Sequence, residues 1–245
     1  MLEWSVLILA GYLAGVLNAI AGGGSFLTFP ALVWAGVPPV MANATSAVAV
    51  LPGYLGGTVG FRRELRTLSR RRHLQLSLVG LAGGLGGALL LLLTPAELFA
   101  QVVPLLLLLA TLMFAFGQTL LRWVRHSEHP LPLLPGVFLV AIYGGYFNGG
   151  LGIMLLALFA AAGMSNILLM NGLKNWLSFV LSFISVAAFA VAGKVLWSEA
   201  LVMMVAATLG GYQGAALSRR LPVAWVKGVV VAVGLVMTVI FTLRV

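Results

Sequence analysis

The sequence predicts an all-α integral membrane protein. Of its 245 residues, 62% are hydrophobic and only 8% are charged, and the mean hydropathy is +1.12. The charges are also clustered: no Asp, Glu, Lys or Arg occurs between Glu3 and Arg62, nor between Arg72 and Glu97. A soluble protein needs a charged face on most of its helices, which these stretches lack, whereas a bilayer-spanning helix needs about 20 apolar residues.

Ten apolar segments, separated by short connectors, cover nearly the whole chain, and we expect a helix in each. They lie at about 4–21, 25–36, 38–61, 74–93, 100–121, 131–148, 151–163, 166–193, 198–217 and 223–243. The segments 25–36 and 151–163 are too short to span, because twelve or thirteen helical residues cover about 18–20 Å of a hydrocarbon core about 30 Å thick. The chain therefore makes ten crossings if these two segments count as crossings, and eight if they re-enter the membrane.

The connectors indicate the orientation. "FRRELRTLSRRRH" holds six of the 14 Lys and Arg residues, and cytoplasmic loops collect such residues, so we place this loop inside. "RWVRHSEH" and "SRRLP" also favour the inside, and "TPAE" favours the outside. This clustering explains the net charge of +9 without nucleic-acid binding. The chain has no cysteine, which excludes disulfides and thiolate metal sites.

The two short segments indicate an internal repeat. "AGGGSFLTFPALVWAGVPPVMANATS" resembles "NGGLGIMLLALFAAAGMSNILLMNGLK" at an offset of about 127 residues, and Gly36 falls on Gly163. We predict a first transmembrane repeat at 1–125 and a second at 126–245. With all three basic connectors inside, each half crosses an odd number of times, so the halves have inverted topology, as in many secondary transporters. A parallel arrangement, which places Arg219 and Arg220 outside, stays open.

Both short segments follow glycine clusters, which we interpret as helix breaks at membrane depth. Irregular backbone is tolerated there only where it is enclosed by protein or lines a cavity. The helix that begins after a break presents unpaired N–H groups and the positive end of its dipole, which favour an anion, and glycine permits close approach. The alternative is tight helix packing, which fits Gly80 with Gly84 well.

Polar residues gather around both breaks, and their amides and hydroxyls suit an oxyanion, although helix–helix hydrogen bonding is the alternative for each. Lys174 is the only charged residue between Glu128 and Lys194, and its natural partner is an anionic ligand unless its stem snorkels to the interface. The predicted substrate-binding residues are Asn18, Gly22, Gly23, Gly24, Ser25, Asn43, Thr45, Ser46, Asn148, Gly149, Gly150, Asn171, Lys174 and Asn175.

The residue types oppose an enzyme. All five acidic residues and all three histidines fall in or beside connectors, and no Ser–His–acid set occurs in suitable positions. We therefore predict no catalytic residue, no metal site, no cofactor and no carboxylate or histidine proton relay through the membrane.

The motifs "AGGGSFLTFPAL", "ANATSAVAVLPG", "YGGYFNGGLGIM" and "NGLKN" resemble the sulfite exporter TauE/SafE family, also called the 4-toluene sulfonate uptake permease family, over essentially the whole chain. The resemblance implies a multi-pass permease of the bacterial or archaeal inner membrane for sulfite, sulfoacetate or related organosulfonates, with sulfide and thiosulfate as further candidates. We expect a secondary transporter that works by alternating access at a midplane anion site, as a monomer or homodimer in the bilayer. Export is favoured by an inside-negative potential, about 2.3 kcal/mol per charge per 100 mV. The alternative is a channel-like anion pore of the same fold.

Overall fold

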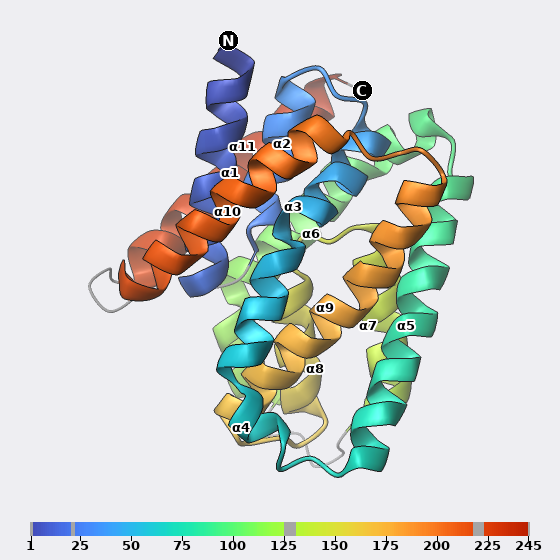
Figure 1. Cartoon of the computed structure of the whole chain (residues 1–245), viewed down its shortest axis with the longest axis vertical. Helices are drawn as coiled ribbons and strands as arrows, with labels where there is room; N and C mark the ends of the chain where they lie inside the picture. The colour runs from blue at the N-terminus through green and yellow to red at the C-terminus, as the bar shows by residue number, and fades with distance from the viewer. Residues whose placement is uncertain (1, 21–22, 125–130, 218–222, 245) are drawn as a thin grey trace.

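Helices lie over all ten apolar segments. The structure, a computed structural model, describes residues 2–20, 23–124, 131–217 and 223–244, and within these ranges it contains helices and no strand, so the all-α prediction is confirmed (Figure 1). In chain order the helices are α1 (Leu2–Ile20), α2 (Ser25–Trp34), α3 (Pro39–Gly60), α4 (Arg62–Leu65), α5 (Arg70–Leu93), α6 (Ala96–Val124), α7 (Leu133–Tyr146), α8 (Leu151–Ala161), α9 (Ile167–Val191), α10 (Trp197–Leu217) and α11 (Val223–Arg244).

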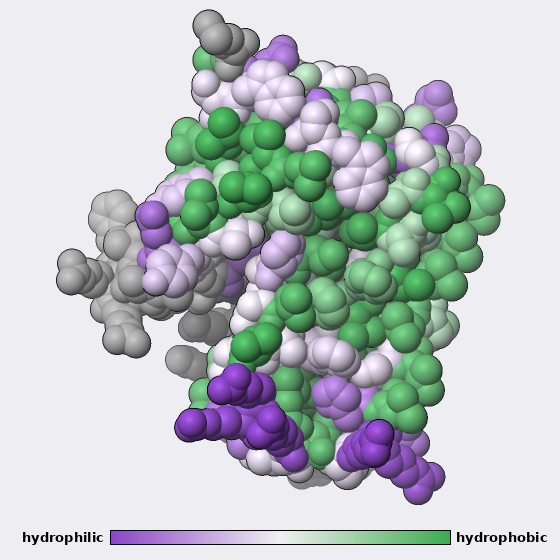
Figure 2. Space-filling model, viewed as in Figure 1, coloured by the Kyte–Doolittle hydropathy of each residue, from purple (hydrophilic) through white to green (hydrophobic). Residues whose placement is uncertain are grey.

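The helices suit a bilayer in length and surface. Among the described residues, three stretches are long and apolar enough to cross a membrane: Arg70–Leu93, Ala96–Gly117 and Ile167–Val191. Large apolar side chains face outward; Leu105, for example, is 66% exposed. Figure 2 shows apolar residues over the middle of one face and strongly hydrophilic residues at its lower end, where α4 and the start of α5 lie. The chain is therefore membrane-embedded.

The long helices pair across the two halves of the sequence. Helices α3 and α9 pack against each other near the centre and run in opposite directions (Figure 1). Helix α1 packs on α10 and α7 packs on α5, while α3 also contacts α10 and α9 also contacts α5. Helices α6 and α11 pack together, α2 contacts α11 and α8 contacts α6. These contacts occur in corresponding pairs. When α1, α2, α3, α5 and α6 of the first half are exchanged in order with α7, α8, α9, α10 and α11 of the second, the α1–α10 contact corresponds to α7–α5, α3–α10 to α9–α5, and α2–α11 to α8–α6.

Both short helices are flanked by glycines with positive φ. Gly23 (φ 92°) precedes α2, and Gly150 (φ 74°) precedes α8. Gly36 (φ 85°) and Gly163 (φ 82°) follow the same two helices. At both ends the glycine N–H and the next N–H turn back to bond carbonyls three and five residues earlier, which is the Schellman way of ending a helix.

Aromatic side chains hold α2 against the connection between α7 and α8. The Phe29 ring packs edge-on against Phe147, with centroids 5.6 Å apart, and stacks on Phe241 of α11 at 5.7 Å. Phe29 and Phe147 are almost completely buried. This contact brings the two short helices, which are more than 100 positions apart in sequence, into one neighbourhood.

The arginine-rich connector is more helical than its charge indicates. The sequence predicts a loop from 61 to 73, but α4 lies within it and α5 already begins at Arg70. Ser69 explains the early start, because its Oγ accepts a hydrogen bond from the Arg72 N–H at 3.3 Å and so caps the helix. Exposed arginines are good helix formers, so the helix extends beyond its apolar part.

Candidate functional site

The starts of the two short helices meet inside the molecule. Helix α2 lies in the upper half of Figure 1 and α8 in the lower half. Ser25, the first residue of α2, donates from Oγ to the carbonyl oxygen of Asn148 at 3.3 Å, and Asn148 lies just ahead of α8. Both side chains are buried. The positive ends of the two helix dipoles therefore converge on one buried region.

Asn148, just ahead of α8, is hydrogen-bonded to three other helices. Its Oδ1 accepts a hydrogen bond from the Tyr54 hydroxyl of α3 at 3.1 Å, and its Nδ2 donates to Ser182 Oγ of α9 at 3.4 Å. Its backbone carbonyl accepts the bond from Ser25. Each partner is 9% exposed or less. The side chain thus fixes the crossing of α3 and α9 over the start of α8.

Hydrogen bonds from side chains and one left-handed glycine fix the backbone just ahead of α2 and α8. The Gly24 N–H donates to Asn18 Oδ1 of α1 at 2.7 Å. Gly150, the N-cap of α8, has left-handed backbone that other residues adopt at a penalty, and the Gly149 carbonyl accepts from the Tyr143 hydroxyl at 2.6 Å. Within the described chain, the N–H groups of Leu151 and Gly152 donate to no protein acceptor. These amides are unpaired, as the first N–H groups of a helix commonly are.

Lys174 lies against the first turn of α8. A Cβ atom placed on Gly152 would be 3.3 Å from Lys174 Cδ and 3.9 Å from Cε, so the lysine stem passes beside this glycine. The Lys174 side chain is half-buried, and no carboxylate of the described residues forms an ion pair with it. The acidic residues that the structure describes lie near helix ends, at Glu3, Glu64, Glu97 and Glu199.

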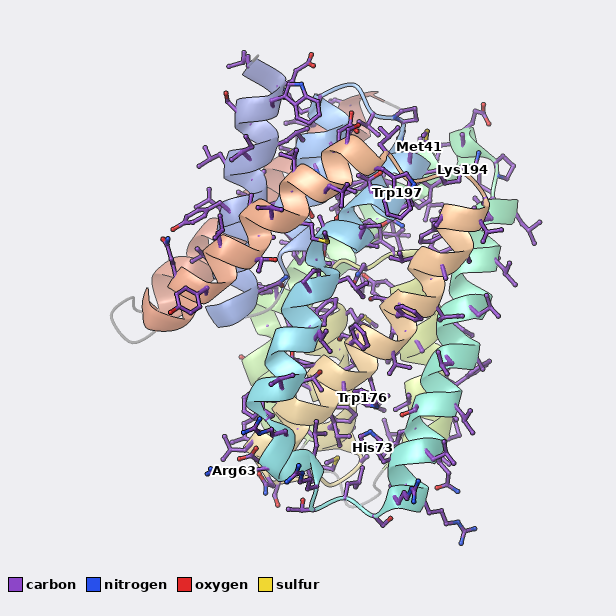
Figure 3. The ribbon with its side chains drawn as sticks, viewed as in Figure 1. Met41, Arg63, His73, Trp176, Lys194 and Trp197 are labelled. Atoms are coloured by element: carbon purple, nitrogen blue, oxygen red, sulfur yellow. The ribbon has the colours of Figure 1, made fainter. Side chains whose placement is uncertain are left out.

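Lys174 belongs to a polar stripe on α9. At 3.6 residues per turn, the members of this stripe lie within about 100° of one another around the helix; they are Asn171, Lys174, Asn175, Ser178, Ser182 and Ser185. On the opposite side, the Trp176 Nε1–H donates to Ser77 Oγ of α5 at 2.8 Å and the ring contacts His73, with centroids 4.9 Å apart. Figure 3 shows Trp176 and His73 together in the lower half of the molecule. This contact anchors the part of α9 that carries Lys174.

Three further predicted residues join helices around this region. Asn175 lies where α9 crosses α3, since a Cβ on Gly57 would be 2.6 Å from its Cγ. Ser46 Oγ of α3 is hydrogen-bonded to Thr28 Oγ1 of α2 at 2.6 Å. Asn43 Nδ2 donates to the carbonyl of Tyr146, the last residue of α7, at 3.0 Å. Asn43 therefore satisfies a carbonyl left free at the end of that helix.

Two predicted residues make their hydrogen bonds elsewhere. Thr45 Oγ1 accepts from the Leu196 N–H at 3.1 Å, at the entry to α10, and Asn171 Nδ2 donates to the Ile167 carbonyl of its own helix at 2.9 Å. Neither hydrogen bond involves Asn148. Gly22 lies outside the described residues. Gly23 lies two residues before α2, and its carbonyl accepts from the Phe26 N–H in the first turn of that helix. Anion binding by all these residues stays a prediction.

Sequence reasoning missed Tyr54 and Ser182, which complete the group around Asn148. The sequence spacing of both residues from predicted site residues could have indicated them. Tyr54 follows Asn43 by eleven residues, which is three helical turns, and Ser182 follows Lys174 by eight, so each lies on a flagged helix face. Chemically, the assembled region combines buried hydroxyl and amide groups with the half-buried Lys174, and no carboxylate of the described residues is bonded to them. Such a set suits a small anion.

Known proteins resemble the chain over most of its length. The model of the family described as Sulfite exporter TauE/SafE matches residues 7–241. The chain belongs to this family. A probable membrane transporter protein of Haemophilus influenzae is 32% identical to this TauE/SafE member over 238 residues, which cover 96% of the chain and 92% of the relative. The probable membrane transporter protein YfcA of Escherichia coli K12 is 30% identical over 217 residues, 86% of the chain and 79% of the relative.

A third relative of this TauE/SafE member is the probable membrane transporter protein ORF9 of a Sinorhizobium species, 28% identical over 213 residues that cover 85% of the chain and 80% of the relative. No solved structure matches the chain. The family and the names of its relatives identify a membrane transporter rather than an enzyme.

Proposed function

We propose that the chain is a secondary transporter that exports a small sulfur-containing anion, such as sulfite, sulfoacetate or another organosulfonate. The anion binds where the starts of α2 and α8 meet, between the two halves, and reaches either side of the membrane by alternating access. The observation that carries the proposal is the position of Lys174, whose stem passes beside Gly152 in the first turn of α8. A cation, two free amides and two helix dipoles then act on one ligand.

We further propose that the halves are inverted-topology repeats. The exchangeable helix pairs and the similar glycine conformations around α2 and α8 support a repeat. The opposite directions of α3 and α9, which correspond to each other in the two halves, support inversion (Figure 1). Inverted repeats that meet around a central site supply two related conformations, one open to each side, which is what alternating access requires.

The donor set favours a singly or doubly charged oxyanion over a cation or a neutral solute. Hydrogen bonds to a charged acceptor contribute about 1.5–3 kcal/mol each, roughly twice the value of neutral ones. The bacterial origin of the relatives supports a location in the bacterial inner membrane, with several crossings. The basic end around α4 then faces the cytoplasm.

A thermal-stability screen of the purified protein tests the substrate class. Sulfite, sulfate, thiosulfate, sulfoacetate and chloride are added separately at matched ionic strength. A ligand at 100 times its Kd stabilises the folded state by about 2.7 kcal/mol, so a selective oxyanion gives a measurable rise in Tm. A Tm that no oxyanion raises above the chloride control contradicts the proposal.

Flux measurements on Lys174→Gln test the site and the mode of transport. Lys194→Gln is the matched control, because Lys194 is exposed and lies beyond the upper end of α9, far along the helix from Trp176 (Figure 3). In proteoliposomes we expect saturable sulfite flux with counterflow for the unaltered chain and for Lys194→Gln, and strongly reduced flux for Lys174→Gln. Conductance without saturation or counterflow indicates a channel-like pore instead, and unchanged flux in Lys174→Gln removes Lys174 from the site.

A further inference from the structure

One buried hydroxyl on α9 has no protein partner. Ser178 is fully buried, and among the described residues its Oγ is the only buried side-chain oxygen or nitrogen without a hydrogen bond. Buried polar groups are otherwise almost always paired, because an unpaired one has lost water and gained nothing. Such a group therefore needs an explanation.

The missing bond is not forced by the helix. Hydroxyls on helices usually have the option of donating to the carbonyl four residues earlier. Several in this chain do so: Ser77 to His73, Thr111 to Leu107 and Ser185 to Leu181, with Ser185 on the same helix as Ser178. Ser178 has the equivalent carbonyl of Lys174 one turn back, yet its hydroxyl makes no bond to it.

The neighbours of Ser178 indicate where its hydroxyl lies. One turn earlier, Lys174 touches the first turn of α8 at Gly152. One turn later, Ser182 bonds to Asn148, just ahead of α8. Residues four apart lie one above the other on a helix face. Ser178 therefore lies on the polar stripe between two residues that both contact the start of α8.

We propose that Ser178 is a substrate-binding residue, whose Oγ–H donates a hydrogen bond to an oxygen of the transported oxyanion while Lys174 balances its charge. This assignment rests on the anion site proposed above and adds to it a residue that is not among the sequence-predicted ones.

The variant Ser178→Ala tests the assignment against the matched variant Ser185→Ala. Ser185 is equally buried, but its Oγ already lies 2.7 Å from the Leu181 carbonyl and 3.0 Å from the Gly84 carbonyl. We measure the Tm without ligand and the Kd for sulfite by titration calorimetry, using the full chain in detergent. Loss of one hydrogen bond to a charged acceptor raises the Kd about tenfold to a hundredfold.

The two variants are expected to differ in both the Tm and the sulfite Kd. Ser178→Ala keeps or raises the Tm without ligand, because it removes an unpaired hydroxyl, and it weakens sulfite binding. Ser185→Ala lowers the Tm and leaves the Kd within about twofold. An unchanged Kd in Ser178→Ala, with sulfite still bound by the unaltered chain, overturns the role of Ser178 and leaves the anion site standing. A Tm loss in Ser178→Ala as large as in Ser185→Ala also overturns it. If the unaltered chain binds no oxyanion, the proposed function itself fails.

Discussion

The bond between Tyr54 and Asn148 allows a quantitative test of the packing around the site. A double-mutant cycle combines Tyr54→Phe with Asn148→Ala and measures how far the two destabilisations depart from additivity. Hydrogen bonds between membrane helices contribute about 0.6 kcal/mol on average and about 1.7 kcal/mol at most. At 3.1 Å this O–H···O bond is slightly longer than the usual range of about 2.5–3.0 Å, so we expect a coupling near the average, about 0.6–1 kcal/mol.

A second cycle with Ser182→Ala sharpens the test. The Asn148–Ser182 bond is longer, at 3.4 Å, so its coupling should be smaller than that of Tyr54. Unfolding in mixed detergent micelles, followed by circular dichroism, gives the free energies. Asn148→Ala combined with Thr208→Val is the control, because Thr208 bonds only the Met204 carbonyl of its own helix and should give additive losses. Additive losses in the Tyr54 cycle, or a larger coupling for Ser182, refute the arrangement around Asn148.

Three further substitutions test the local geometry. Gly152→Ala places a Cβ 3.3 Å from Lys174 Cδ, so calorimetry should show sulfite binding weakened several-fold without a loss of Tm, since Ala is the better helix former by about 1 kcal/mol. Gly150→Ala forces a left-handed backbone on Ala and should destabilise the chain by about 1–2 kcal/mol in denaturation, whereas Gly56→Ala, with no atom within 4 Å of its new Cβ, should not. Asn166→Ala removes the N-cap that accepts from the Leu168 and Leu169 N–H groups at 3.1 Å; a loss of about 1 kcal/mol with an unchanged sulfite Kd is expected, and a changed Kd would argue against a purely structural role.

The sequence predicts the positions of most helices, because an apolar stretch in lipid must satisfy its own backbone hydrogen bonds and therefore forms a helix. The two short segments and the glycines ahead of them correspond to α2 and α8. The exceptions occur where that rule does not apply. Helix α4 and the first turn of α5 are rich in arginine, so hydropathy does not predict them; the early start of α5 is set by the Ser69 cap.

The sequence predicts only some of the site residues, because hydrogen-bond partners depend on which helix faces pack against each other. The sequence predicts Ser25, Asn148 and Lys174 as site residues, and all three lie near the start of α8. Thr45 was flagged for its place beside Asn43 in sequence, yet its hydroxyl turns to the Leu196 amide near α10. Ser178 looks like any helical serine in sequence, and only its unpaired, buried state in the fold distinguishes it.

The most direct test of the anion site is a crystal structure with selenite, a heavier analogue of sulfite whose selenium is located by anomalous scattering. We predict an anomalous peak in the buried region where α2 and α8 begin, with selenite oxygens about 3 Å from the Lys174 Nζ and from the first N–H groups of α8. A peak found only beside the arginines of α4 and α5, in crystals of protein that selenite stabilises, would contradict the account.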